Sequence, residues 1–321
     1  MNSPATDELL GNSPEFAALL RSLDVAAATD VTVMLQGESG VGKELLARRL
    51  HRHSARADAP FVAVNCAALP EALAESELFG HRKGAFTGAV ADAPGLIESA
   101  RGGLLFLDEV AEMSLSVQAK LLRFLESGEY QAVGDTRMRQ ADLRIVAATH
   151  ADLQQRVADG QFRADLFYRL NVVPFQVPAL RERRDDILLL LEAFTRRFAE
   201  RYGLQPPRYA GSCLKWLEND YAWPGNVREL RNFSERMLVL FSGREVARDN
   251  LPGEMRTAAA GDGRFGFRLP SEGIRLDELE QDLLRQALRQ TRGNQSRAAR
   301  LLGLTRDAFL YRLKKYSILS S

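Results

Sequence analysis

The chain has 321 residues, of which 45% are hydrophobic and 26% charged, and its formal net charge is +1. These values are typical of a folded globular protein, and the length favours about two domains at ~150 residues each. The balanced charge excludes a uniformly polycationic chain, so any affinity for nucleic acid must come from a local patch. The two cysteines form no CxxC motif, which excludes a disulfide framework or a cysteine-rich zinc site. No apolar run approaches the ~18 residues of a membrane span and no secretory signal is visible, so we expect a cytoplasmic protein with no membrane partner.

Short apolar strands alternate with helical patterns through the first part of the chain. The expected strands are Val31–Leu35, Phe61–Val64, Gly103–Leu107, Arg144–Ala148 and Val172–Val177, and Ser116–Glu126 is one of the helical patterns between them. This alternation predicts an α/β fold with a parallel sheet covered by helices on both faces. We expect this α/β subdomain over residues 1–183.

The composition changes twice in the second half of the chain. From residue 184 the strands stop and amphipathic helices follow, which predicts a helical lid subdomain over 184–252. Residues 253–273 are rich in glycine and show no sustained period of 3.6 or 2, which predicts a flexible linker. A small all-α module is expected over 274–321.

The first expected strand leads directly into a glycine-rich turn and a helix. The segment fits the pattern G-x-x-x-x-G-K and reads Gly37-Glu38-Ser39-Gly40-Val41-Gly42-Lys43. Its glycines let backbone N–H groups curve around phosphates, and Lys43 is placed to reach the β- and γ-phosphates of ATP. The next residue is Glu44, where the motif usually has the hydroxyl residue that binds Mg²⁺. On this motif alone, a glycine-rich turn without a ligand remains an alternative.

A second half of the same site follows the third expected strand. Gly103–Leu107 is apolar and is followed by Asp108 and Glu109. Asp108 at the carboxyl end of a buried strand can hold Mg²⁺, directly or through water, and so replace the absent hydroxyl. Glu109 can polarise the attacking water as a general base. The alternative is a strand that ends in a solvated acidic turn.

A short segment between these two strands has the character of a loop tip. In Gly84-Ala85-Phe86-Thr87-Gly88-Ala89, two glycines bracket an aromatic and a hydroxyl residue. Such a loop can present Phe86 and Thr87 outward. On the physics of the segment alone, an ordinary turn with Phe86 tucked into the core is the favoured interpretation.

The GAFTGA hexapeptide, preceded by Glu77-Leu78-Phe79-Gly80-His81, resembles the AAA+ bacterial enhancer-binding proteins that activate sigma-54 RNA polymerase. The resemblance extends over roughly residues 8–252 and 277–319. It implies that the loop Gly84–Ala89 contacts sigma-54 and moves with the nucleotide state. The architecture is similar to the phage shock activator type, which has no regulatory domain at its N-terminus. We therefore expect no receiver, GAF or PAS-like input domain, and either a regulator acting in trans or a truncated chain.

The resemblance also assigns roles to residues around the nucleotide. Asn65 matches the switch residue that pairs with Glu109; otherwise it is a polar end to a strand. Gly128–Asp142 resembles a second inserted hairpin, with its turn near Gly134-Asp135. Thr149 matches sensor I, where the family often has Asn at the next position and this chain has His150, whose role we leave unassigned.

Three arginines complete the site that the resemblance implies. Arg163 and Arg169 match the trans-acting arginines that reach the γ-phosphate held by a neighbouring subunit, where such a residue contributes ~10³–10⁵ in rate. The alternative is that one of them only pairs with an acidic neighbour. Arg228, in the segment Trp223–Leu230, matches sensor II; the alternative is a surface salt bridge. Arginines that act in trans imply a homo-oligomer, in this family usually a hexameric ring.

The expected C-terminal module has the pattern helix, short turn, helix. Helical patterns cover Leu276–Thr291 and Gln295–Leu302, and a further helix starts after Thr305 as N-cap. From residue 292 onward there are seven basic residues and one acid, a local charge of +6. The module resembles the Fis-type DNA-binding domain, with a core of Ala298, Ala299, Leu302, Leu304, Phe309 and Leu313. A basic helical bundle that only oligomerises is the alternative.

The resemblance implies two kinds of DNA contact in this module. Thr305, Arg306 and Tyr311 are the candidates for contacts with bases. Phosphate contacts, which set the register without reading sequence, fall to Arg297, Arg312, Lys314 and Lys315. Fis-type domains dimerise, so we expect a two-fold-symmetric enhancer site.

The resemblance therefore implies an ATP-dependent activator that binds enhancer DNA and remodels the sigma-54 RNA polymerase holoenzyme from the closed to the open complex, with Mg²⁺ and ATP. Two other interpretations are a DNA-binding regulator that does not use sigma-54 and a general AAA+ remodeller. The intact GAFTGA motif disfavours the first, and the helix-turn-helix pattern disfavours the second.

Overall fold

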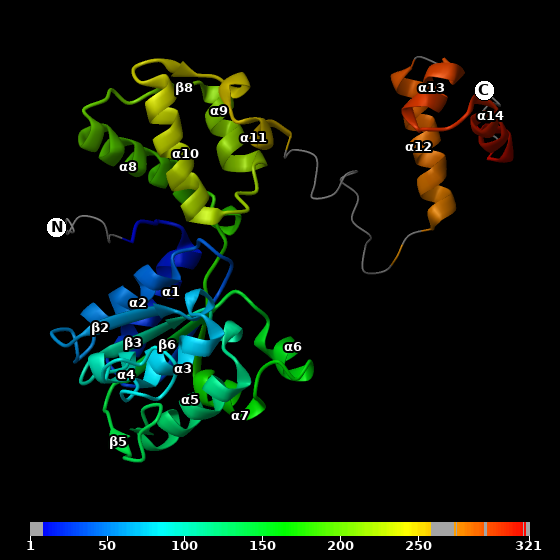
Figure 1. The fold of residues 1–321 in the computed structure, drawn as a ribbon. Coiled ribbons are helices and arrows are strands. Elements are labelled where there is room, and N and C mark those ends of the chain that lie inside the picture. The colour runs from blue at the N-terminus through cyan, green and yellow to red at the C-terminus, as the bar shows by residue number, and fades with distance from the viewer. Residues whose placement is uncertain (1–8, 258–272, 274, 292–293, 317, 319–321) are drawn as a thin grey trace. The chain divides into compact units, whose positions relative to one another are not determined.

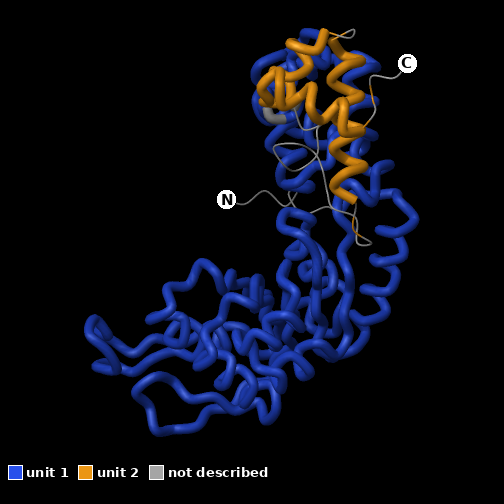
Figure 2. Tube along the Cα trace, turned by 90° about the vertical axis from the view of Figure 1, so that its right-hand side faces the viewer, with its two compact units in different colours: residues 1–259 blue, residues 260–321 orange. Residues whose placement is uncertain are grey.

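The computed structural model describes residues 9–257, 273, 275–291, 294–316 and 318. The chain divides into two compact units, residues 1–259 and 260–321, shown in different colours in Figure 2. Among the described residues, no helix combines the length and the apolar character needed to cross a membrane.

A five-stranded parallel sheet organises the first unit (Figure 1). Its order is β2-β3-β6-β1-β7, and every neighbouring pair is parallel. The strands are β1 (Val33–Gln36), β2 (Phe61–Asn65), β3 (Leu104–Asp108), β6 (Arg144–Thr149) and β7 (Val173–Gln176). The five strands expected from the sequence are thus confirmed, with ends that differ by at most two residues.

Apolar side chains of the sheet point alternately into two cores. In β3, Leu105 and Leu107 belong to one core, and Leu104 and Phe106 belong to the other. The two cores lie on opposite faces of the sheet because successive side chains of a strand point to opposite sides. The helices that cover it are α1 (Pro14–Ala27), α2 (Lys43–Arg52), α3 (Glu71–Phe79), α4 (Leu96–Ser99), α5 (Leu115–Ser127), α6 (Leu153–Ala158) and α7 (Ala164–Leu170).

The second insertion expected from the resemblance forms a hairpin. Its strands are β4 (Glu129–Tyr130) and β5 (Arg139–Gln140), and they pair antiparallel. The expected hairpin over Gly128–Asp142 is confirmed, and Gly134 adopts the positive φ of +75° that a turn here requires.

The lid follows a 3₁₀ turn, η4 (Leu180–Glu182). It contains α8 (Asp185–Tyr202), α9 (Gly211–Lys215), the π-helical η5 (Trp216–Asp220), α10 (Asn226–Phe241) and α11 (Gly253–Thr257). The expectation of an all-helical lid is wrong in one detail, because β8 (Arg208–Tyr209) pairs in parallel with β9 (Glu245–Val246).

The expected linker begins too early at residue 253. Residues 253–257 form α11, and Met255 is only 3% exposed within the lid core. A buried methionine attaches this turn of helix to the lid, and the sequence rule that relies on glycine content does not detect a single apolar anchor. Residues 258–272 of the expected linker lie outside the described residues.

The second unit contains the three expected helices, α12 (Leu276–Gln290), α13 (Gln295–Leu301) and α14 (Arg306–Lys315). The predicted core is confirmed: Ala298, Ala299, Phe309 and Leu313 are buried with Leu284 and Ala287, and Leu302 and Leu304 pack against them partly buried. Thr305 caps α14 as expected, and its hydroxyl accepts a hydrogen bond from the Ala308 N–H at 3.3 Å. Of the expected helix break, Asn294 caps α13, whereas Gly293 lies outside the described residues.

Candidate nucleotide site

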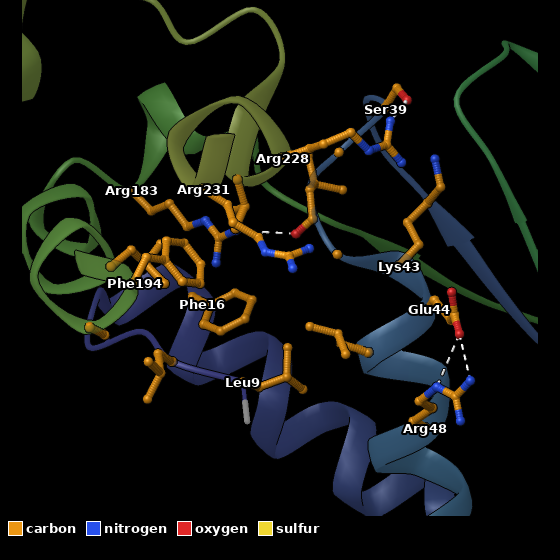
Figure 3. A pocket seen from close by; sticks show the side chains of 18 of the residues that line it. Leu9, Phe16, Ser39, Lys43, Glu44, Arg48, Arg183, Phe194, Arg228 and Arg231 are labelled. Atoms are coloured by element: carbon orange, nitrogen blue, oxygen red, sulfur yellow. Dashed lines mark hydrogen bonds and ion pairs between the residues drawn. The ribbon is translucent and has the colours of Figure 1, made fainter. Parts of the chain in front are cut away.

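The glycine-rich turn between β1 and α2 borders a cleft of about 1200 Å³. In Figure 3, Leu9, Phe16 and Phe194 form one side of this cleft, while Ser39, Lys43 and Arg228 lie at the other. Apolar and aromatic groups suit a nucleobase, and cations and backbone N–H groups at a helix start suit phosphates. The cleft therefore has the polarity of a nucleoside triphosphate, with its two ends distinct.

Lys43 is buried at the start of α2 and is only 6% exposed. Its Nζ donates a hydrogen bond to the Gly37 carbonyl at 2.8 Å and lies 3.5 Å from Glu109 Oε1. Both partners are acceptors, so a phosphate can compete for the ammonium group. Asp108 and Glu109 line the same cleft as the glycine-rich turn, so the two halves of the predicted site lie together as expected.

Asp108 and Glu109 differ in their environments although they are adjacent. Burial raises the pKa of the Asp108 carboxyl, and the positive charge of Lys43 only partly offsets this. Burial would also raise the pKa of Glu109, but the hydrogen bond from His150 and the charge of Lys43 outweigh it, so that pKa lies below its ordinary value. Glu109 is therefore an anion near neutral pH, as a general base must be.

The environment of Asp108 is compatible with Mg²⁺, whereas the Glu44 carboxylate is already bound by an arginine. Glu44 Oε1 accepts a hydrogen bond from Arg48 Nη2 at 2.6 Å on the surface of α2. No cluster of three or more potential metal ligands occurs among the described residues. Mg²⁺ does not need such a cage, since it binds through one or two carboxylates together with substrate phosphates and water.

The glycine-rich loop is attached to the lid by a polar network. Glu38 accepts two hydrogen bonds from the Arg181 guanidinium, at 2.8 and 2.5 Å, and one from the Asn226 side-chain amide at 3.0 Å. The bonds from Arg181 and Asn226 lower the pKa of Glu38 to about 2. Asn226 is fully buried, also donates to the Ser39 carbonyl, and accepts from the Leu180 N–H. Sequence reasoning missed this role of Asn226, although it lies in the segment assigned to sensor II.

Arg228 also faces the loop from the lid. Its Nη1 donates to Ser39 Oγ at 3.1 Å, and its N–H donates to the Gly40 carbonyl. No ion pair involves Arg228 among the described residues, so the surface salt-bridge alternative is not what the structure contains. Gly40 itself has φ +81°, and a Cβ there would lie 2.5 Å from the Gly225 carbonyl oxygen. Only glycine permits this close approach of loop and lid.

Asn65 is not paired with Glu109, although the resemblance implied that it would be. The Asn65 side-chain oxygen accepts a hydrogen bond from the Ala67 N–H at 3.0 Å, which caps the short turn after β2. The Thr149 hydroxyl is buried and accepts from the Ala151 N–H. Glu109 is instead bound by His150, whose Nδ1 lies 2.7 Å from Glu109 Oε2. The histidine at position 150, where the family often has Asn, was the feature of the sequence that could have indicated this contact.

The loop Gly84–Ala89 lies outside both cores of the sheet. Thr87 is exposed, and the Phe86 ring is partly buried with its edge against His81, at a centroid distance of 5.0 Å. The interpretation that places Phe86 in the core is therefore wrong. The loop is attached to the second hairpin: Arg82 Nε donates to Asp135 at 2.8 Å, and a Cβ on Gly134 would lie 2.7 Å from that of Ala85. The two insertions form one connected surface.

Three family models match consecutive parts of the chain. They are the sigma-54 interaction domain over residues 9–176, the AAA+ ATPase lid domain over 181–264, and the bacterial regulatory protein, Fis family, over 275–316. The chain belongs to the sigma-54 interaction domain family.

Relatives and solved structures agree with this assignment. The chain is 47% identical over 315 residues to the phenol regulator MopR of Acinetobacter guillouiae, covering 96% of this chain and 56% of that protein. It is 45% identical to the response regulator protein PilR of Pseudomonas aeruginosa, covering 98% and 71% respectively. The structure of NtrX from Brucella abortus in complex with ATP has a TM-score of 0.73 at 38% identity, over 97% of this chain and 69% of that one. The chain spans a little over half the length of MopR.

Two arginines of this sigma-54 interaction domain lie apart from the cleft, and neither lines it. Arg163, before α7, forms an ion pair with Asp165 at 2.7 Å, as one alternative anticipated. Arg169 donates two hydrogen bonds to the Leu125 carbonyl. Both side chains are exposed on the protein surface. They cannot act on the nucleotide of their own subunit without leaving these positions.

The Fis-type unit exposes all but one of the residues assigned to DNA: Arg297, Thr305, Arg306, Tyr311, Lys314 and Lys315. Arg312 is the exception, because its Nε donates to Glu280 Oε1 of α12 at 2.5 Å. Tyr316 donates to the other oxygen of the same carboxylate at 2.6 Å. We correct the assignment of Arg312 from a phosphate contact to a residue that joins α14 to α12. Phe309, on the same helix, is fully buried and therefore belongs to the core of the unit and not to its DNA-contacting surface.

Proposed function

We propose that the protein is an ATP-driven activator that binds enhancer DNA and converts the closed promoter complex of sigma-54 RNA polymerase to the open complex. The observation that carries this proposal is the intact GAFTGA loop, exposed at Thr87 and built on a sheet whose P-loop cleft suits ATP. Relatives that are named as regulators support the proposal, because they are 47% and 45% identical to this chain over 96% and 98% of its length.

ATP hydrolysis is the chemical step of the proposal. Lys43 and the N–H groups of the glycine-rich loop bind the phosphates, and Glu109 accepts a proton from the attacking water. Asp108, together with phosphate oxygens and water, would hold Mg²⁺, which neutralises developing charge on the phosphates when bound. Arg228 contacts the loop from the lid and is placed to sense the bound phosphates.

A shared catalytic site accounts for Arg163 and Arg169. Since both are exposed and neither lines the cleft of its own chain, they are available to a neighbouring subunit. We propose that each reaches the γ-phosphate bound next to it, in a closed ring, most simply a hexamer. The ion pair of Arg163 with Asp165 would then open on assembly.

The Fis-type unit supplies the DNA contact of the proposal. The exposed Arg297, Lys314 and Lys315 would bind phosphates, and Thr305, Arg306 and Tyr311 would lie against bases. Binding at an enhancer raises the effective concentration of the ATPase near the promoter.

Open-complex formation by sigma-54 RNA polymerase with ATP tests the proposal. We expect the unmodified chain to open the promoter, and Thr87→Ala to hydrolyse ATP without opening it. The matched control is Ser212→Ala, an exposed hydroxyl on lid helix α9, which should open the promoter normally. ATP hydrolysis without opening by the unmodified chain would favour another remodelling target, and DNA binding without ATP hydrolysis would favour a plain DNA-binding regulator.

A further inference from the structure

The lid side of the nucleotide cleft carries arginines whose charge is not neutralised. Arg196 and Arg197 of α8 and Arg228 and Arg231 of α10 line this side, together with the carboxylate of Glu200. Arg228 is bonded to the glycine-rich loop. Among the described residues, none forms an ion pair or a side-chain hydrogen bond with Arg196, Arg197 or Arg231. We call these three residues the lid arginine face.

Arg231 is the member of this face that shares a helix with the arginine at the glycine-rich loop. It follows Arg228 by three residues on α10, so the two side chains lie on the same side of that helix. Figure 3 shows both of them at the cleft. Arg231 is exposed, and its guanidinium lies over the Phe198 ring, 5.8 Å from the centroid. An aromatic ring steadies a guanidinium but leaves its charge and its N–H donors available.

Bound ATP does not require the lid arginine face. The negative charge of the triphosphate is met at the loop end of the cleft by Lys43, Arg228 and Mg²⁺. The other end of the cleft is lined by apolar and aromatic groups that suit the base. The lid arginine face therefore offers positive charge to a second anionic partner beside the nucleotide.

A carboxylate with the complementary charge lies next to Arg163. Asp165 accepts two hydrogen bonds from the Arg163 guanidinium, at 3.0 and 2.7 Å, and is about half exposed. In the proposed ring, Arg163 leaves this pair for the γ-phosphate of the neighbouring subunit. Asp165 must accompany it, because two residues of chain span at most ~7 Å. The carboxylate thus arrives at the neighbouring cleft without its partner.

An unpaired carboxylate at that position opposes assembly. It is repelled by the bound phosphates, and it loses water to the interface without gaining an ion pair in return. A guanidinium on the facing surface removes both penalties, because its planar donors match a carboxylate in the same bidentate way that Arg163 does within one chain. The lid arginine face borders the cleft that Arg163 enters, and it has such groups free.

We propose that the lid arginine face is a contact surface for a second copy of this chain, and that Arg231 binds Asp165 of the neighbouring subunit. The ion pair within one chain, Arg163 with Asp165, is exchanged for one between chains. Assembly then frees Arg163 for the phosphate and leaves no carboxylate unpaired. This inference rests on the proposed shared catalytic site, and it names the residues that pair when that site forms.

Two charge-reversed chains test the contact by mixing. In Asp165→Arg and in Arg231→Glu, like charges face each other across every interface. We expect each variant alone to raise the protein concentration for half-maximal ATP hydrolysis per subunit about tenfold or more. An equimolar mixture can alternate the two chains, and every contact then joins opposite charges. The mixture and the double variant should return to within about threefold of the unmodified chain.

Arg196→Glu is the matched control, because Arg196 belongs to the same face but lies on α8. Mixed with Asp165→Arg, it should leave assembly as weak as it is for Asp165→Arg alone. Asp165→Lys and Arg231→Asp form a second pair that gives the same test if a first variant does not fold. A rescue that only mixing or the double variant produces identifies a contact between chains, since a defect within one chain persists in the mixture.

The other occupant to exclude is the nucleotide itself. We expect Arg231→Glu to weaken the binding of a fluorescent ATP analogue by less than about fivefold. A larger loss of nucleotide affinity without rescue by mixing assigns Arg231 to the nucleotide and overturns the proposal. The proposal is also overturned by normal assembly of both single variants, or by equal rescue with Arg196→Glu.

Failure of the proposed function has a different outcome. If hydrolysis per subunit by the unmodified chain does not rise with protein concentration, the shared site is refuted, and this contact with it. If it does rise and mixing gives no rescue, only the contact of Arg231 with Asp165 is refuted. If mixing restores hydrolysis but sigma-54 RNA polymerase forms no open complex, the contact stands and the proposed target is wrong.

Discussion

Replacing Asn226 by Asp should loosen the lid from the glycine-rich loop. In the structure, the Asn226 amide nitrogen donates to Glu38 Oε2 at 3.0 Å and to the Ser39 carbonyl at 3.1 Å. An aspartate keeps the shape and still accepts from the Leu180 N–H. It turns the donor into an acceptor, however, and brings a second carboxylate against Glu38.

The size of the effect is limited by protonation. Two unit charges 3.0 Å apart repel by about 5 kcal/mol at an effective dielectric constant of ~20. Protonating the new carboxylate at pH 7 costs only about 4 kcal/mol, given an ordinary pKa of about 3.9. Because protonating the aspartate costs less free energy than the charge repulsion, the cost of protonation is the upper limit of the stability loss. Glu38 is 43% exposed and partly screened by water, and we therefore expect a loss of about 2 to 3 kcal/mol in the free energy of unfolding.

The loss should depend on pH in a defined direction. Only the Asn226→Asp variant has a carboxyl at this position, and the charge of Glu38 raises the pKa of that carboxyl in the folded state. Such a group destabilises above its ordinary pKa, and the loss disappears as pH falls toward about 4. Glu38 keeps its two hydrogen bonds from Arg181 in the variant, and these are the largest cause of its lowered pKa, so we expect it to stay ionised in this window.

Tryptophan fluorescence during urea unfolding measures this directly, since both tryptophans, Trp216 and Trp223, lie in the lid core. Adding Glu38→Gln should recover about half of the loss caused by Asn226→Asp, since the new amide can donate to the aspartate. Asn232→Asp, exposed on the same helix, is the control and should change stability by less than about 0.5 kcal/mol. A loss below that value for Asn226→Asp, or strictly additive single and double variants, would refute the reasoning.

Two further changes test other parts of the structure. Arg144 is 1% exposed and donates hydrogen bonds to the carbonyls of Ala26, Ala27 and Val31. Because Arg144→Met leaves these carbonyls at the end of α1 unsatisfied, it should lower the free energy of urea unfolding by about 2 to 4 kcal/mol. A loss no larger than that of the exposed Arg101→Met would contradict this. In the Fis-type unit, Arg312→Ala should lower the thermal midpoint by breaking the contact with Glu280, whereas Lys314→Ala should leave the midpoint unchanged and reduce the salt slope of DNA binding by about 1. Equal behaviour of these two variants in both assays would restore Arg312 to the phosphate contacts.

Backbone strain in the first unit gathers around the nucleotide site. Among the described residues, the non-glycine residues with positive φ are Glu109, Trp223 and Asn226. Glu109 directly follows strand β3, and the other two flank the turn that starts α10. Conformations of this kind persist only where surrounding contacts enforce them. Here the contacts are those with His150, with the lid core and with Glu38.

Local sequence determined much of this protein. Strand and helix positions follow from apolar periodicity, and the glycine-rich loop and the Asp108–Glu109 pair follow from motifs whose geometry is set within a few residues. The N-cap at Thr305 and the small core of the Fis-type unit are local in the same sense. Short-range patterns of this kind predict structure well because the backbone and the nearest neighbours decide it.

Only the tertiary structure decided which polar groups meet. Asn226 meets Glu38 across 188 residues of sequence, and His150 meets Glu109 across 41. Arg312 was assigned to DNA from its charge, and it lies instead against Glu280, 32 residues earlier. Met255 attaches residues that composition alone assigned to a linker. The physical reason is common to these cases: a side chain's partner depends on which chain segments packing brings within about 3 Å, and the charge and spacing of one segment do not specify the other.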